Sequence, residues 1–328
     1  MQVAQLYIGS TLSLSEVLKV VEVSRSSFYF KPKAELKNKV GRKPSIITFL
    51  KNGGFVSNKI VVEEIEKILG EEFVDYGYLK VTHHLRDELD CIINPKKVYN
   101  LMKINELLYV KTSSINRSAR NWVRDFVPNP ELDFAHLEFD IKYFYVWGQK
   151  RNAMILTVID VKSRWNLGQY IAWQISYENV IQLFNEIFKI TQIPASIFVR
   201  CDNGSQFVAQ AVQDYFKTLK EKTGREVIQE FTKPATPEQN GHVESYHSIV
   251  ERVVCQRYQF ENLNELKNTM ERFKYFYNFK RIHSGLQYKS PYEYLLNKGI
   301  DMIVNPLEKS SYCSITNVNN NLEILSNN

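Results

Sequence analysis

The sequence predicts an α/β protein in which a mixed-sheet domain follows all-α helix-turn-helix segments. Two observations predict this class. The first 110 residues carry helix-start signals and apolar side chains at helical spacing, whereas residues 132–300 alternate strand-like apolar runs with helical ones. The composition, 44% hydrophobic and 24% charged, is that of a globular protein, and no run of 18 apolar residues offers a membrane span.

The net charge of +6 is unevenly distributed. Residues 1–125 hold 20 Lys and Arg against 14 Asp and Glu, which leaves 22 against 22 for residues 126–328. A basic part joined to a neutral part suggests a phosphate-binding module beside a working module. The alternative is that the positive excess is ordinary surface charge without a role in binding.

Residues 1–30 have the pattern of a helix-turn-helix. Ser13 and Glu16 form an S-x-x-E helix start, and apolar residues follow at helical spacing. Ser24 can cap a second short helix, which in such a motif enters the major groove. We therefore predict DNA contacts at Ser24 and Arg25, with a plain helical hairpin as the alternative.

Residues 31–57 are interpreted as a basic linker. The stretch from Lys31 to Lys43 has six basic residues and one acid, which suits a flexible segment that follows a phosphate backbone. Within it, Arg42 and Lys43 resemble an arm that inserts into the minor groove. A solvated linker without DNA contacts is the alternative.

Residues 58–110 form a second predicted helix-turn-helix domain. Helices are expected at Asn58–Leu69, ended by Gly70, at Tyr78–Leu89, and after Asn94, where Pro95 takes the first helical position. The last helix has a basic outer face, for which we predict three DNA contacts: Lys96, Lys97 and Lys103. Residues 111–131 are expected to be a linker.

The core domain spans residues 132–300, and a loosely ordered tail occupies residues 301–328. The pattern predicts the order βββαβαβα, which implies a mixed sheet covered by crossover helices. The expected elements are strands at Leu137–Trp147, Met154–Val161, Leu167–Trp173, Ile197–Cys201 and Val227–Phe231, and helices at Tyr177–Thr191, Ser205–Leu219 and Gly241–Cys255.

Three acidic residues lie at positions where the fold alone does not explain an acidic side chain. Asp140 is in the middle of the first core strand, where Asp is disfavoured on structural grounds alone. Asp202 ends a buried strand and precedes a helix, and the carboxyl ends of such strands are where open α/β sheets place their sites. Glu244 lies in the first turn of a helix, after a Pro-rich loop.

These contexts resemble the DDE transposases of bacterial insertion sequences, which belong to the retroviral-integrase-like superfamily. The likeness covers nearly the whole chain and is carried by motifs in a fixed order. They are Asp140 in the first strand, Asp202-Asn203-Gly204-Ser205-Gln206-Phe207, the block from Pro237 through Gly241 to Glu244-Ser245, the trailing set Tyr277, Asn278, Arg281, His283 and Leu286, and Ser290-Pro291.

The resemblance implies an RNase-H-like catalytic core in which Asp140, Asp202 and Glu244 hold Mg²⁺ or Mn²⁺, as two ions. Such ions suit in-line displacement at phosphorus, because they activate one oxygen and stabilise another. The implied activity is cleavage of element ends and strand transfer into target DNA by a multimer. His242 and His247 are interpreted as phosphate contacts or packing residues. The alternative is an integrase-like DNA-binding protein without activity.

Two features depart from the family pattern. The gap between Asp202 and Glu244 holds 41 residues, longer than usual, so Glu238 stays open as the third acid. Relatives often carry Lys or Arg seven residues after the catalytic Glu, where this chain has Glu251, and we expect Arg252 or Lys233 to supply the missing charge. Four dispersed cysteines without a CxxC pair fit a reducing cytoplasm. The resemblance implies that this is the bacterial cytoplasm, with the protein in association with the nucleoid.

Overall fold

A computed structural model describes residues 13–30, 44–109, 129–190, 193–233 and 237–302. The chain divides into two compact units, residues 1–46 and residues 47–328. The predicted DNA contacts Arg42 and Lys43 lie outside the described residues, as do nearly all of the predicted second linker and tail.

The first unit contains both predicted short helices, α2 (Leu14–Val20) and α3 (Arg25–Phe28). The capping box at the start of α2 is confirmed, since the Ser13 N–H donates to the Glu16 carboxylate at 2.8 Å and the Glu16 N–H donates back to the Ser13 hydroxyl at 3.4 Å. Ser24 caps α3 by accepting the Ser27 N–H at 3.1 Å. The Ser24 side chain therefore has a structural role at the start of this helix.

The second unit begins with three helices, α4 (Asn58–Gly70), α5 (Tyr78–Asp87) and α6 (Pro95–Ile104). All three were predicted, and the Asn94 side chain caps α6 by accepting the Lys96 N–H at 2.8 Å. Each helix buries one apolar stripe, because residues three and four apart share a face. The residues buried in these stripes include Val61, Ile65, Val81, Leu85, Val98 and Met102.

The prediction of an all-α segment preceded by a linker through residue 57 was wrong in one respect. Three short strands form an antiparallel sheet in the order β2-β1-β3: β1 (Ile47–Leu50), β2 (Phe55–Ser57) and β3 (Cys91–Ile92). Their side chains at Phe49, Phe55 and Ile92 are exposed. Strands this short, with apolar residues on the outer face, lack the alternation of buried and polar positions that signals a strand in sequence.

The core domain is built on a five-stranded sheet in the order β6-β5-β4-β7-β8. β4, β5 and β6 are antiparallel to one another, whereas β7 runs parallel to β4 and β8 parallel to β7. The mixed sheet and its strand order along the chain are therefore as predicted. The strands are β4 (His136–Val146), β5 (Arg151–Asp160), β6 (Asn166–Ala172), β7 (Ser196–Cys201) and β8 (Glu226–Phe231).

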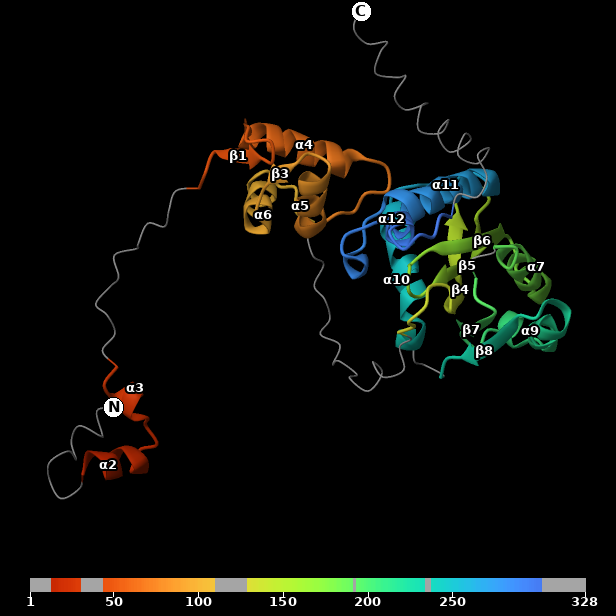
Figure 1. Ribbon diagram of the computed structural model, residues 1–328, viewed down its shortest axis with the longest axis horizontal. Helices are drawn as coiled ribbons and strands as arrows, with labels where there is room; N and C mark the ends of the chain where they lie inside the picture. Colours follow the sequence, from red (N-terminus) through yellow and green to blue (C-terminus); the bar gives the residue numbers. More distant parts are fainter. Residues whose placement is uncertain (1–12, 31–43, 110–128, 191–192, 234–236, 303–328) are drawn as a thin grey trace, which may run out of the picture. The chain divides into compact units, whose positions relative to one another are not determined.

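Helices cover both faces of this sheet (Figure 1). Phe139, on one face of β4, packs against Phe184 of α7, which in turn packs against Phe216 of α9. The other face contributes Phe144 and Val146 to a cluster with α10 and α11. The helical segments are α7 (Tyr177–Ile187), α8 (Ser205–Val208), α9 (Gln210–Thr223), η2 (Pro237–Asn240), α10 (Gly241–Val250), η3 (Glu251–Cys255), α11 (Leu263–Tyr275), η4 (Phe276–Lys280), η5 (Ser284–Leu286) and α12 (Pro291–Leu296).

Two predicted helices differ in detail from the observed ones. The helix expected at Ser205–Leu219 is interrupted at Ala209, whose extended backbone separates α8 from α9. The helix expected at Gly241–Cys255 is continuous but ends in the π-helical turn η3. In the part of the chain that the structure describes, no helix combines the length and apolar character required to cross a membrane.

Candidate active site

Two of the predicted acids lie on neighbouring parallel strands. Asp140 is in β4, between the apolar residues Phe139 and Ile141. Asp202 directly follows the last residue of β7. The β4–β7 register pairs Glu138 with Arg200, so positions 140 and 202 correspond, two residues further along each strand. Parallel pairing thus brings together residues 62 apart in sequence.

The surroundings of Asp202 disfavour its charged form. Burial raises the pKa of the Asp202 carboxyl, and the nearby Asp140 carboxylate raises it further, while the Gly204 N–H, 2.9 Å from Asp202 Oδ1, opposes the shift. A Cβ at position 204 would lie 2.6 Å from Gln206 Nε2 and 3.0 Å from Asp202 Oδ1, so a larger residue there would displace the Gln206 side chain. A cation between the two carboxylates would relieve their repulsion.

Three side-chain pairs connect one face of β4 to the continuous helix formed by α10 and η3. Positions 138, 140 and 142 share a face of the strand, because side chains alternate. Each contacts one helix residue: Glu138 Oε1 lies 2.7 Å from His242 Nδ1, Asp140 Oδ2 lies 3.3 Å from His247 Nδ1, and Lys142 Nζ lies 2.8 Å from Glu251 Oε2. We call these three pairs the β4–α10 ladder.

The spacing of the ladder follows from helix and strand geometry. Two strand residues span about 6.6 Å, and four or five helix residues rise about 6–7.5 Å, so side chains two apart on β4 meet side chains four or five apart on the helix. The ladder therefore fixes the register of α10 on β4. Because Glu244 is on α10 and Asp140 is on β4, it also fixes the positions of two of the predicted acids.

Glu138 is the most buried member of the ladder and is fully inaccessible to solvent. Its Oε2 accepts hydrogen bonds from the backbone N–H groups of His242 at 2.8 Å and Val243 at 2.9 Å. These groups lie in the first turn of α10, where an N–H has no acceptor within the helix. Burial raises the pKa of Glu138 to about 7, against the opposing effects of the Val243 N–H and the Arg200 charge. A side chain of β4 thus caps the helix that carries Glu244.

Glu244 lies in the first turn of α10, as predicted, and lines a pocket of about 460 Å³. The pocket is also lined by Lys142, His247, Ser248, Glu251 and Arg252. Since His247 contacts Asp140, it connects the pocket to the two aspartates. The Nε2 atom of His247 is buried and has no hydrogen-bond partner among the residues that the structure describes.

The donor chemistry of Asp140, Asp202 and Glu244 fits a hard divalent cation, because all three supply carboxylate oxygens. The repulsion between Asp140 and Asp202 also favours a cation at this position, because a cation would offset it. Among the described residues, however, no group of three or more His, Cys, Asp and Glu side chains is close enough to hold a metal ion. The structure brings together the two aspartates, and Glu244 is linked to them through the pocket and His247.

The predicted DNA contacts have different surroundings. Lys96 and Lys103 are exposed on α6, and Arg25 is exposed on α3. Lys97 instead donates to the Ile47 carbonyl at 2.5 Å and so links α6 to β1. The exposed Lys233 follows β8.

The remaining predicted contact, Arg252, donates to the Asp75 carboxylate through Nε at 3.1 Å and Nη2 at 3.0 Å. Its side chain is 50% exposed and lines the pocket.

Glu138 and Lys142 are site residues that sequence reasoning missed. Both were visible as charged residues two positions on either side of Asp140, on the same strand face. A charged residue at every second position of a strand that is otherwise apolar is the signal that could have found them. Lys142 pairs with Glu251, the residue at the position where relatives often carry Lys or Arg. Of the two cations expected to supply the missing charge, Arg252 lines the pocket of Glu244 together with Lys142. His242 and His247 are ladder residues, which agrees with their interpretation as packing residues.

Comparison with protein families matches two successive parts of the second compact unit. A model described as an HTH-like domain matches residues 57–112, and two models described as an integrase core domain match residues 131–224 and 225–291. The two core matches cover every strand of the five-stranded sheet and the positions of Asp140, Asp202 and Glu244. The sheet is that of an RNase-H-like integrase core.

Curated relatives match this chain over different shares of its length. The transposase for insertion sequence element IS904 of Lactococcus lactis is 26% identical over 252 residues, which cover 73% of this chain and 94% of the relative. The InsK protein for IS150 of Escherichia coli is 25% identical, covering 86% and 93%. An integrase, ORF3, of Spiroplasma virus SpV1-C74 is 26% identical over 48% of this chain, which spans about half (47%) of that protein.

Among solved structures, the HTLV-2 integrase catalytic core domain in complex with magnesium is similar at 13% identity and a TM-score of 0.38, over 50% of this chain and 98% of that one. The assignment rests on the family models and the insertion-sequence relatives. Together, the integrase core matches and the insertion-sequence relatives support a DDE-type insertion-sequence transposase, from a class of metal-dependent polynucleotidyl transferases.

Proposed function

We propose that this transposase binds the ends of an insertion sequence and catalyses DNA strand cleavage and strand transfer with Asp140, Asp202 and Glu244. The observation that carries the proposal is the meeting of Asp140 and Asp202 on neighbouring parallel strands beside the helix of Glu244. The intact set of three acids favours an active enzyme over an inactive DNA-binding protein.

The three carboxylates would hold two Mg²⁺ or Mn²⁺ ions. When bound, these ions stabilise negative charge on the scissile phosphate and on the attacking and leaving oxygens. The attacking group is first a water molecule and then the 3′-hydroxyl of the cleaved strand, so no protein nucleophile is required.

Other residues of the chain hold the acids in place and receive the DNA. His247 supports the Asp140 carboxylate from α10, and Glu138 holds the start of that helix on β4. Lys142 and Arg252 bring positive charge to the pocket of Glu244, where a phosphate group can approach. Glu251 partly neutralises the charge of Lys142, which lowers the positive potential in the pocket.

End recognition is assigned to the N-terminal units. Candidate contacts are Ser24, Arg25, Arg42, Lys43, Lys96, Lys97 and Lys103, with Lys233 and Arg252 in the core. Two element ends must be held together for transposition, so we expect the active form to be a homo-oligomer. Its place of action would be DNA in the bacterial cytoplasm.

The test is an assay of the purified chain with labelled element ends. The expected result is nicking and joining at the ends in the presence of Mg²⁺ and neither product with EDTA. End binding without either product in Mg²⁺ or Mn²⁺ would instead support the inactive alternative. Cutting without joining would support a nuclease.

A prediction concerns the exposed lysines of α6. We expect the double substitution Lys96→Ala and Lys103→Ala to weaken end binding and to reduce the slope of log affinity against log salt by about 0.9 for each DNA phosphate that is no longer neutralised. The measurement is a gel-shift titration at several salt concentrations. Lys59→Ala is the control, because Lys59 is 87% exposed in the same domain but at the start of α4. An equal loss of affinity with Lys59→Ala would mean that α6 has no special part in binding.

A further inference from the structure

Residues 71–76, in the segment that connects α4 to α5 in the HTH-like domain, pack directly on the C-terminal helices of the integrase core. Phe73 is 2% exposed. Its ring lies against Phe273 at 5.5 Å, Phe276 at 5.9 Å and Tyr258 at 6.0 Å between centroids. An aromatic side chain buried in this way joins the two domains through one apolar cluster.

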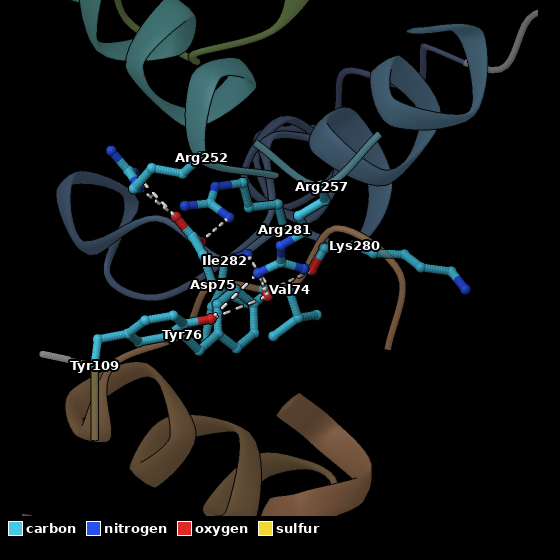
Figure 2. A network of polar contacts seen from close by, with 9 residues as sticks. All are labelled: Val74, Asp75, Tyr76, Tyr109, Arg252, Arg257, Lys280, Arg281 and Ile282. Carbon is cyan, nitrogen blue, oxygen red and sulfur yellow. Dashed lines mark hydrogen bonds and ion pairs between the residues drawn. The ribbon is translucent and has the colours of Figure 1, made fainter. Parts of the chain in front are cut away.

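Asp75 is the polar centre of the same contact (Figure 2). Its Oδ1 accepts from Arg281 Nη1 at 2.5 Å, and its Oδ2 accepts from Arg252 Nη2 at 3.0 Å. The side chains of Asp75 and Arg281 are only 6% and 3% exposed. Burial acts to raise the pKa of Asp75, but Arg281, Lys80 and Arg252 outweigh it and hold the pKa below its usual value. Asp75 is therefore a buried charge whose two ion-pair partners, Arg281 and Arg252, come from the core domain.

Backbone contacts surround this ion pair. The Tyr76 hydroxyl accepts the Ile282 N–H at 3.2 Å and lies 3.5 Å from the Lys280 carbonyl, to which it donates. Arg257 donates to the Val74 carbonyl at 2.8 Å. In Figure 2 these groups converge from the HTH-like domain on one side and the core helices on the other. Contacts to main-chain atoms restrict sliding between the two domains.

The contact also accounts for the trailing motif, which the proposed chemistry leaves without a role. Asn278 accepts the Asn166 N–H at 2.8 Å and donates to its carbonyl at 3.0 Å, which ties η4 to β6. Arg281, three residues later, turns to Asp75. The motif thus links the catalytic sheet to the DNA-binding domain.

We infer that Asp75 and Arg281 are positioning residues, which hold the HTH-like domain at a set distance from the active site and so determine where the DNA is cut. The inference rests on the proposed function. Its physical basis is that Asp75 also binds Arg252, which lines the pocket of Glu244. DNA held by the HTH-like domain then enters the pocket in a fixed register, as orientation of reactants requires.

The experiment compares Asp75→Asn with Glu72→Gln in the full chain. Glu72 is the matched control, since it pairs with Arg272 across the same contact but both side chains are about 40% exposed. We expect Asp75→Asn to bind element ends as the unsubstituted chain does, to cut them about tenfold to a hundredfold more slowly, and to spread the cuts over neighbouring nucleotides. Asp75→Glu should restore much of the single cut position.

The readouts are gel shift, cleavage rate and cut position on a sequencing gel, with thermal unfolding as the test of folding. If Asp75→Asn does not fold, Tyr76→Phe is used in its place, because it removes only the hydroxyl. A folded variant that cuts at the usual position and within about twofold of the usual rate overturns the inference. So does an equal spread of cuts with Glu72→Gln. If the unsubstituted chain itself does not cut, the proposed function fails instead.

Discussion

Replacement of Asp140 or Asp202 by Asn is expected to abolish both cleavage and joining while leaving end binding nearly intact. Asn keeps the size of the side chain but removes the charge that would hold a divalent cation, which contributes several kcal/mol of transition-state stabilisation, or about a thousandfold or more in rate. The predicted DNA contacts are on other residues, so binding is preserved. The measurement is Mg²⁺-dependent cleavage beside a gel shift.

Asp214→Asn is the control for both variants. Asp214 is exposed on α9 and accepts a hydrogen bond from Gln210, so its charge has no part in the site. We expect that variant to keep full activity. Substantial Mg²⁺-dependent cleavage by either purified site variant would falsify the assignment of that aspartate.

The third acid is tested by the same assay. We expect Glu244→Gln to remove activity and Glu238→Gln to have a small effect, since Glu244 is on a helix whose register is fixed by the β4–α10 ladder. Glu251→Gln should keep activity, because it only releases Lys142 from its ion pair. An active Glu244→Gln beside an inactive Glu238→Gln would move the third ligand to Glu238.

The second large effect is expected at Glu138. Glu138→Ala leaves the N–H groups of His242 and Val243 and the His242 ring without their buried partner, which should lower the free energy of unfolding by about 3–5 kcal/mol. It should also lower the cleavage rate at temperatures where the protein is folded, because α10 then loses its register on β4. Thermal unfolding and single-turnover cleavage are the measurements.

Glu138→Gln separates geometry from charge. The Gln carbonyl can accept both N–H groups and its amide can donate to His242 Nδ1, so we expect little loss of stability or rate. Glu226→Gln is a control for the loss of an exposed charge, as its pair with Lys220 lies at the surface. A Gln variant as damaged as the Ala variant would show that the charge of Glu138, and not its hydrogen bonds, is what matters.

Local signals in the sequence were sufficient for most elements of the core. Mid-strand placement singled out Asp140, and helix-start signals gave correct beginnings for α2 and α6. The short strands β1 and β2 were missed, because four- and three-residue strands with exposed Phe49 and Phe55 have no readable period. Strand pairing depends on partners distant in sequence, which no local pattern records.

The sequence by itself predicted the order of the core elements, the family resemblance and the three candidate acids, because motifs and hydrophobic periods are carried by neighbouring residues. Only the tertiary structure decided what those residues touch. It paired Glu138, Asp140 and Lys142 with the helix of Glu244, and it turned Arg281 toward Asp75, 206 residues away. Such contacts depend on the packing of whole elements. A buried charged side chain is costly unless it is paired, and which partner lies within reach is decided by that packing.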